Sequence, residues 1–193
     1  MGTGRLEAFS DGVLAIIITI MVLALEVPHE ASLGALAALW PRLLSYVLSF
    51  VYVGIYWNNH HHLMQAAKSV DGLVLWANLH LLFWLSLLPF TTGWMGENQF
   101  GRWPMLVYGL NLLACALAYY GLQRALIRHD GRGETLARAL GSDWKGKVSP
   151  VLYLLGIGAA WFDYGVLSLF CFAATAILWL VPDRRIERAL HAR

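Results

Sequence analysis

Residues 13–27 read VLAIIITIMVLALEV, an apolar run in which only Thr19 and Glu26 are polar. Apolar positions that reach back to Phe9 lengthen the run, and Pro28 ends it. A helix that spans a bilayer needs about 20 predominantly apolar residues. This stretch therefore predicts a first membrane-spanning helix.

The whole chain shares the character of that run. Of its 193 residues, 59% are hydrophobic and 13% are charged, whereas a soluble domain is about half apolar and about a quarter charged. Too few charges remain to cover a surface that faces water. The composition predicts a single all-α membrane domain over residues 1–193, surrounded by membrane lipids.

Further apolar runs follow the first one. We expect six spans, at about residues 5–27, 36–62, 73–95, 104–127, 147–162 and 164–181. Pro41 interrupts the outer end of the second run, so that helix begins either near residue 36 or after the proline. Asp163 alone separates the last two runs, which predicts a very tight hairpin.

The distribution of basic residues predicts the orientation of these spans. Of the 14 Lys and Arg residues, only Arg42 and Arg102 fall on one side of a six-span layout, and the rest fall on the other. Short loops rich in Lys and Arg stay in the cytoplasm. We therefore expect both termini on the cytoplasmic side of the cell's inner membrane.

The composition also bears on other classes of function. The net charge of +2 comes without a stretch of interleaved basic and aromatic residues, so we expect no nucleic-acid partner. Cys115 and Cys171 lie inside apolar runs, where we expect free thiols rather than metal ligands or a disulfide. We expect no bound metal ion and no cofactor.

Asp11 is the first of several polar residues within the apolar runs. The ordinary interpretation is a helix N-cap, since Ser10, Asp11 and Gly12 are all common at that position. Residues 5–8 favour helix, however, so we expect the helix to begin earlier and to contain Asp11. A carboxylate inside a membrane helix needs a partner from another helix.

Residues 57–62 read WNNHHH at the inner end of the second run. Successive residues of a helix point about 100° apart, so three adjacent histidines cannot bind one metal ion together. Side chains of this kind often form hydrogen bonds between membrane helices. We expect Trp57, Asn59 and His60 to donate hydrogen bonds to Asp11, with Asn78 of the third run as a further candidate donor.

Asn78 lies near the inner end of the third run, at the same membrane depth as Asp11 and His60. The shared depth predicts a packed polar network among the first three helices. Pro89 is expected to kink the third helix towards its outer end. For His80, an ordinary interfacial or core position is the simpler interpretation.

Three motifs in these runs resemble those of a known family. Residues 5–12, RLEAFSDG, are similar to the R-x-x-x-F-S-D signature on the first helix of the lysosomal and bacterial potassium-channel family. Residues 57–61, WNNHH, resemble its second-helix motif, and Asn78 with residues 88–92, LPFTT, resembles its third. The resemblance covers the first three runs in order, whereas the last three match only as apolar helices.

That resemblance implies a fold and a function. Prokaryotic members have six spans and assemble as homotetramers, with the first helix of each subunit lining a central pore that modestly prefers potassium to sodium. Hydrogen bonds to the second and third helices hold the Phe-Ser-Asp region. The corresponding network here would contain Arg5, Phe9, Ser10, Asp11, Trp57, Asn59, His60 and Asn78. The threefold repeat at residues 60–62 leaves open which histidine takes part.

Side chains must provide any ion selectivity, because the sequence has no Thr-Val-Gly-Tyr-Gly filter and intact helices use their own carbonyls. Thr19 is the mid-membrane polar residue of the first run, flanked by Ile16, Ile20 and Leu23. The ordinary interpretation places these apolar residues against lipid or core. The resemblance instead places Ile16 at a hydrophobic constriction and Thr19 at a polar layer one turn further out.

A potassium-permeable cation channel that conducts passively is thus the first hypothesis, with potassium as the permeant ion. The alternative is a proton-coupled secondary transporter that uses Asp11 and a histidine. Transporters often contain inverted repeats with broken helices, and we find no such pairing. A membrane enzyme is disfavoured, because neither a nucleophile motif nor a second carboxylate accompanies the histidines.

Overall fold

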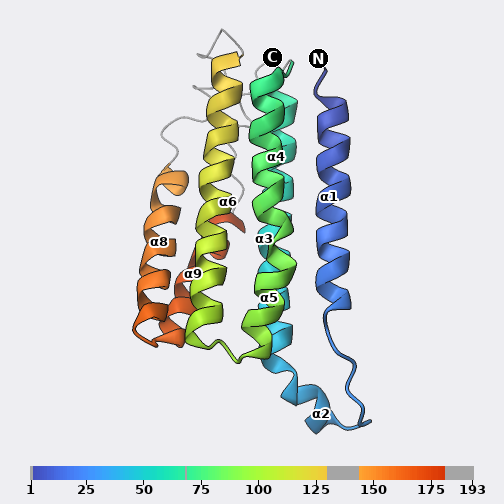
Figure 1. Ribbon diagram of the computed structural model, residues 1–193, viewed down its shortest axis with the longest axis vertical. Helices are drawn as coiled ribbons and strands as arrows, with labels where there is room; N and C mark the ends of the chain where they lie inside the picture. The colour runs from blue at the N-terminus through green and yellow to red at the C-terminus, as the bar shows by residue number, and fades with distance from the viewer. Residues whose placement is uncertain (1, 68, 130–143, 181–193) are drawn as a thin grey trace.

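The computed structural model of the protein describes residues 2–67, 69–129 and 144–180, which form an all-helical bundle (Figure 1). Figure 1 shows the long helices side by side, with one short helix projecting past the end opposite the N-terminus. The helices are α1 (Gly4–Leu23), α2 (Leu33–Ala38), α3 (Trp40–Ala66), α4 (Gly72–Ser86), α5 (Leu88–Glu97), α6 (Arg102–His129), α8 (Trp144–Trp161) and α9 (Gly165–Leu180).

Three of these helical segments are long and apolar enough to cross a membrane. They are α1, the rod that α4 and α5 form together (Gly72–Glu97), and α6. α9 is also apolar but shorter. The all-α membrane class predicted from composition is therefore confirmed, whereas the number of six spans stays a prediction.

α1 ends at Leu23, short of residue 27 where the first span was predicted to end. Val27 precedes Pro28, and a residue before proline is disfavoured in the helical region. Glu26 lies in the connection that follows and forms an ion pair with Arg42 in the first turn of α3. This ion pair joins the far end of α1 to the next long helix.

The second predicted span is divided between two helices. Ser32 caps the short α2, its hydroxyl accepting a hydrogen bond from the N–H of Ala35 at 3.1 Å. α3 then begins at Trp40, with Pro41 in its first turn. Proline suits this position because the N–H that it lacks would have no partner within the helix. The long helix therefore starts at Trp40, one residue before the proline, and not near residue 36.

Pro89 and Asp163 produce the two other interruptions that the sequence predicts. The α4–α5 rod is broken at Leu87, because Pro89 has no N–H to donate to the carbonyl of Leu85. Between α8 and α9, Asp163 adopts a φ of 61°, which reverses the chain within a few residues. The kink and the tight hairpin are both present.

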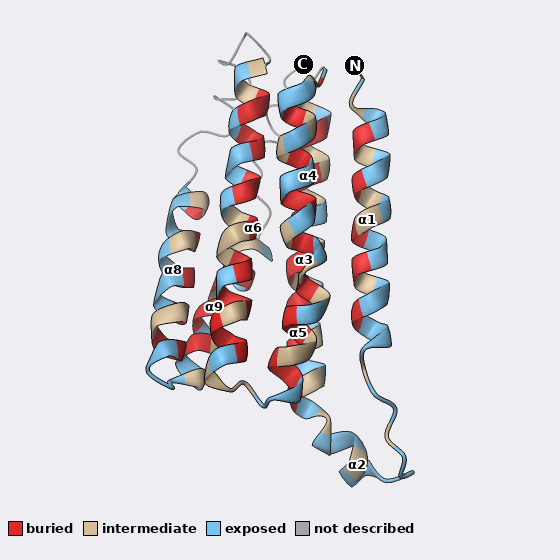
Figure 2. Cartoon of the chain, viewed as in Figure 1, coloured by how far each residue is buried: buried red, intermediate tan, exposed pale blue. Residues whose placement is uncertain are grey.

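α1 packs against the bundle along one face only (Figure 2). Its buried residues recur every three or four positions and face α3, α4 and α5. They are Leu6, Ser10, Leu14, Ile17 and Met21. The opposite side has no neighbour within the described residues, and we call it the uncovered face of α1. Its exposed residues are Arg5, Phe9, Gly12, Ile16, Thr19, Ile20 and Leu23.

Phe172 of α9 connects the helices on the other side of the bundle. Its ring lies between Gly109 of α6 and Gly156 of α8, where an added Cβ atom would come within 2.6 Å and 2.5 Å of the ring. Tyr52 of α3 donates its hydroxyl to the carbonyl of Phe172 at 2.7 Å. α9 is therefore in contact with three other helices at one residue.

Candidate functional site

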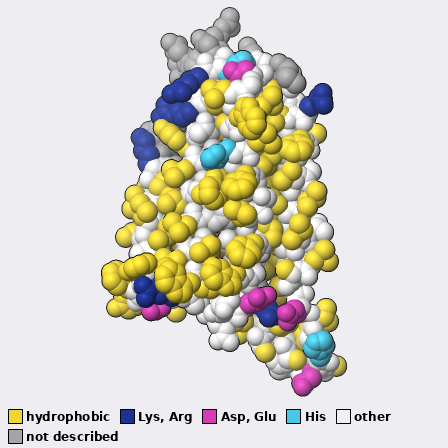
Figure 3. Space-filling model, viewed as in Figure 1, with side chains coloured by type: hydrophobic (Ala, Val, Ile, Leu, Met, Phe, Trp, Pro, Cys, Tyr) yellow, Lys and Arg dark blue, Asp and Glu magenta, His cyan; other side chains and the backbone are white. Residues whose placement is uncertain are grey.

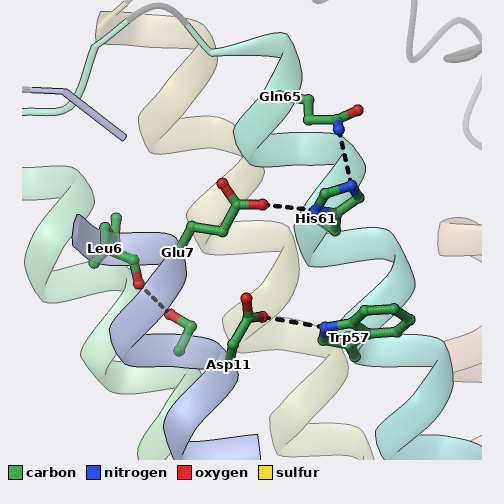
Figure 4. A network of polar contacts seen from close by, with 7 residues as sticks. Leu6, Glu7, Asp11, Trp57, His61 and Gln65 are labelled. Atoms are coloured by element: carbon green, nitrogen blue, oxygen red, sulfur yellow. Dashed lines mark hydrogen bonds and ion pairs between the residues drawn. The ribbon is translucent and has the colours of Figure 1, made fainter. Parts of the chain in front are cut away.

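α1 and α3 are joined by two polar contacts one helical turn apart (Figure 4). Trp57 donates its indole N–H to a carboxylate oxygen of Asp11 at 3.1 Å. Glu7 Oε1 lies 2.6 Å from Nδ1 of His61, and Nε2 of that ring lies 2.8 Å from the side-chain nitrogen of Gln65. The four-residue spacing on each helix places both contacts on one helix–helix face.

Asn78 of α4 forms a third connection, deeper in the bundle. Its amide oxygen lies 2.8 Å from His60 Nε2, and its amide nitrogen donates to the hydroxyl of Ser10 at 3.0 Å. Ser10 donates in turn to the carbonyl of Leu6 at 2.8 Å. Because the amide oxygen of Asn78 can only accept, the Nε2 atom of His60 carries the proton.

Two of the predicted donors to Asp11 that lie on α3 form other hydrogen bonds. Asn59 donates to the carbonyl of Ile55 in its own helix at 2.8 Å, and His60 is bonded to Asn78. Helix geometry explains the correction, since Asn59 and His60 lie about 160° and about 60° around α3 from Trp57. Asn78, the fourth predicted donor, donates to Ser10 instead, so only the Trp57 side chain bonds to Asp11.

The contacts also distinguish the three adjacent histidines. His60 bonds to α4 and His61 bonds to α1, whereas the Nδ1 atom of His62 is buried with no hydrogen bond to the described residues. Glu7 is the partner that sequence reasoning missed. The spacing in the sequence could have identified this partner, because Glu7 precedes Asp11 by the same four positions that separate Trp57 from His61.

Arg5 and Phe9 lie outside these contacts in the single chain. Phe9 is 54% exposed, and Arg5 is exposed with no ion pair to the described residues. A helix turns 100° per residue, so both positions point in the same direction as Gly12 and Ile16. They belong to the uncovered face of α1 rather than to its packed face.

The uncovered face of α1 also contains the predicted pore residues. Ile16 is 59% exposed and Leu23 is 77% exposed, with Thr19 and Ile20 exposed between them. Thr19 donates its hydroxyl to the carbonyl of Ala15 at 2.9 Å. Its proton is therefore engaged within the helix, and the oxygen lone pairs remain available to a cation.

Cys115 and Cys171 are buried free thiols, as predicted. Across the three described ranges, no three His, Cys, Asp or Glu side chains gather closely enough to hold a metal ion. The polar contacts of α1 thus consist of protein groups bonded to one another.

Comparison with known proteins relates these contacts to a family. Residues 5–89 match the family described as endosomal/lysosomal potassium channel TMEM175. A potassium channel of Chryseobacterium sp. (strain P1-3) is 51% identical over 190 residues, which is 98% of each chain. The chain belongs to the TMEM175 family. The matched segment contains every residue that joins α1 to α3 and α4.

A solved TMEM175 homologue has the same fold. The crystal structure of a lysosomal potassium-selective channel homologue from Chamaesiphon minutus superposes with a TM-score of 0.80 at 28% identity, covering 93% of this chain and 96% of that one. The human endosomal/lysosomal proton channel TMEM175 is 30% identical over 193 residues, which is 90% of this chain and 36% of the human protein.

Proposed function

We propose that this TMEM175 chain is one subunit of a potassium-permeable channel in which four copies surround a central pore lined by α1. The uncovered face of α1 is the observation that carries the proposal. The similar potassium channel of Chryseobacterium supports the choice of ion. Potassium passes down its gradient, and the passage requires no cofactor.

The composition of the uncovered face favours a pore over a lipid contact. Along α1 it runs from Arg5 through Gly12 to Thr19, and Glu26 follows beyond the helix end. Polar side chains within a membrane face a bundle interior or a water-filled path. No other part of the described chain covers this face, so further copies of the chain would complete the path.

Ile16 and Thr19 have different roles in the proposed pore. Positions three residues apart on a helix are about 4.5 Å apart along its axis. A ring of four Ile16 side chains is narrow and apolar, and it restricts ions by excluding water. The Thr19 oxygens replace part of the hydration shell, which potassium releases more readily than sodium. Ile20 and Leu23 continue the wall of the pore.

The polar contacts on the packed face hold α1 in one rotation. Trp57 and His61 fix it against α3, while Asn78 fixes it against α4. A rotation by one residue, about 100°, would break these contacts and turn Ile16 away from the axis. The network therefore determines which side chains of α1 face the pore, although it lies outside the pore.

We further propose six spans, with both termini in the cytoplasm, in the cell's inner membrane. Single cysteines, introduced after replacement of Cys115 and Cys171, test this with a membrane-impermeant maleimide. Glu30→Cys and Asn98→Cys should react from outside, and Gly133→Cys only after permeabilisation. Position 133 lies outside the described residues. Labelling of Gly133→Cys in intact cells would contradict the topology.

Reversal potentials in liposomes test the channel directly. Purified protein should give unitary currents that follow the potassium gradient, with a shift when sodium replaces potassium. A proton-coupled transporter would instead give saturating flux, dependent on the proton gradient and without unitary currents. That second result would overturn the channel.

A further inference from the structure

A cavity lies at the end of the bundle away from the N-terminus, where the α5–α6 connection meets the α8–α9 turn (Figure 1). Its volume is about 410 Å³, which falls in the range of about 300–1,000 Å³ that is usual for small-molecule sites. Its walls come from the first residue of α3, the start of α6 and the α8–α9 hairpin. None of its lining residues belongs to α1, so the cavity is separate from the proposed pore.

Arg102, the first residue of α6, lines this cavity with donors that lack an acceptor. A guanidinium carries several N–H donors, and none of them forms a hydrogen bond to the residues that the structure describes. The Nε atom is buried. A carboxylate oxygen of Asp163 lies 3.8 Å from a terminal nitrogen, which is too long for a hydrogen bond. Because buried donors without an acceptor are unfavourable, the guanidinium favours a further anionic partner.

Two indole rings hold this guanidinium at the edge of the cavity. Its central carbon lies 4.7 Å from the centre of the Trp161 ring and 5.4 Å from that of Trp103. Such contacts position a cation without supplying an oxygen acceptor. Tryptophan is also typical of the membrane–water interface. Figure 3 shows a broad hydrophobic band over the middle of one face, with basic side chains beside acidic ones at the end away from the N-terminus. The cavity therefore lies near the depth of lipid headgroups.

The backbone around the cavity has an unusual conformation. Gln99, Phe100 and Asp163 have φ angles of 49°, 59° and 61°, which non-glycine residues seldom adopt. All three line the cavity, and no other non-glycine residue in the described ranges has a positive φ. Conformations of this kind cluster at functional sites such as ligand clamps. The side chain of Asp163 is 69% exposed, so its carboxylate is accessible to a cationic group.

We propose that this cavity binds the headgroup of phosphatidylethanolamine. The phosphate accepts hydrogen bonds from Arg102, whose parallel N–H groups match two phosphate oxygens. The primary ammonium of the headgroup donates to Asp163. The glycerol end lies against Trp40 and Phe100, which line the cavity with ring centres 5.6 Å apart. A headgroup with both charges complements the site, whereas the carboxylate of Asp163 would repel a purely anionic one.

Photolabelling of the full-length protein in liposomes tests the site. The probe is phosphatidylethanolamine with a diazirine in one acyl chain, close to the glycerol. It should form saturable adducts on Trp40, Phe100 or Met105, which all line the cavity. Liposomes present the probe in both leaflets, so the test does not depend on the orientation of the protein.

Two lipids with the same diazirine are matched controls. Phosphatidylcholine should label these residues about tenfold more weakly, because its quaternary ammonium has no N–H to donate. Phosphatidylglycerol should also label about tenfold more weakly, because it has no cation to pair with Asp163. Labelling by either control as strong as that by phosphatidylethanolamine would overturn the proposal. Displacement of the probe by inorganic phosphate would show a site for a free anion and would overturn it as well.

Variants examine the two charges of the site separately. Asp163→Asn removes the carboxylate, and asparagine tolerates a positive φ. This variant should label equally with phosphatidylethanolamine and phosphatidylglycerol, and a retained preference would overturn the role of Asp163.

Arg102→Gln should weaken labelling by phosphatidylethanolamine about tenfold. Its matched control is Arg42→Gln, which removes a basic residue at the same end of the bundle but outside the cavity, and which should leave labelling unchanged. An equal loss in both variants would show that surface charge alone attracts the lipid. Elution volumes in gel filtration confirm that each variant is folded.

Discussion

Asp11 and Trp57 lie 46 positions apart in the sequence, and a hydrogen bond of 3.1 Å joins them. This bond, with that between Glu7 and His61, connects α1 to α3 along a face that is only partly buried. Beyond these two contacts, α1 is held by the hydrogen bond between Asn78 and Ser10 and by one row of apolar residues. Its position in the bundle therefore rests on a few polar groups whose loss can be measured.

Trp57→Phe should lower the free energy of unfolding by about 1 kcal/mol, because it leaves the Asp11 carboxylate without its donor. The value lies at the low end of the range for lost hydrogen bonds, since Trp57 is 49% exposed. Denaturant unfolding of the purified protein measures it. Trp76→Phe is the matched control, because Trp76 is 74% exposed. Equal stability of the two variants would contradict this.

Asn78→Leu should cost more, about 1–3 kcal/mol, because it leaves the buried His60 and Ser10 without their shared partner. Asn78 forms one hydrogen bond to His60 and one to Ser10. Ser10→Ala removes only the second of these and should cost less. In a double-mutant cycle, the two substitutions should be non-additive, as expected for residues of one network. Simple additivity would show that the two bonds act independently.

Ile16→Asn should raise the leak of cations through reconstituted channels, because the amide side chains hydrate an otherwise apolar ring. Single-channel conductance and open probability in liposomes measure this. Ile18→Asn is a suitable comparison, since Ile18 is half-buried and does not belong to the uncovered face. Unchanged conductance in Ile16→Asn would place some other helix at the axis.

Thr19→Val should weaken the preference for potassium over sodium, because it keeps the shape of the side chain and removes the oxygen. Its effect on folding should be small, since the hydroxyl bonds only to the carbonyl of Ala15 in the same helix. Thr19→Ser keeps the oxygen and should keep the preference. The reversal potential under mixed potassium and sodium decides between them. The same ratio in all three proteins would exclude Thr19 from selectivity.

Much of the fold could be predicted from the sequence, because membrane helices must be long and apolar. The break before Pro89 and the turn at Asp163 were both predicted, since proline lacks a donor and one polar residue leaves no room for a longer loop. The end of α1 was misplaced, because apolar residues continue past Leu23 while Glu26 is drawn to Arg42. A hydropathy pattern contains no information about which distant residues form an ion pair.

The polar network could be predicted only in part. Shared depth brought together Asp11, Trp57 and Asn78, but depth says nothing about which way each side chain points around its helix. Rotation decides that Trp57 faces α1 and that Asn59 does not. Rotation depends on packing against neighbouring helices, which an all-round apolar sequence does not specify.

The ring of Phe172 has further consequences for how the molecule is made. It occupies a slot between Gly109 of α6 and Gly156 of α8, so α9 has no complete packing surface until both of these helices are in place. Because only residues 162–164 connect α8 to α9, these two helices would pack against α6 together, as one hairpin. Docking of that hairpin then completes the half of the bundle opposite α1, and a chain that ended before Phe172 would leave the slot between the two glycines open.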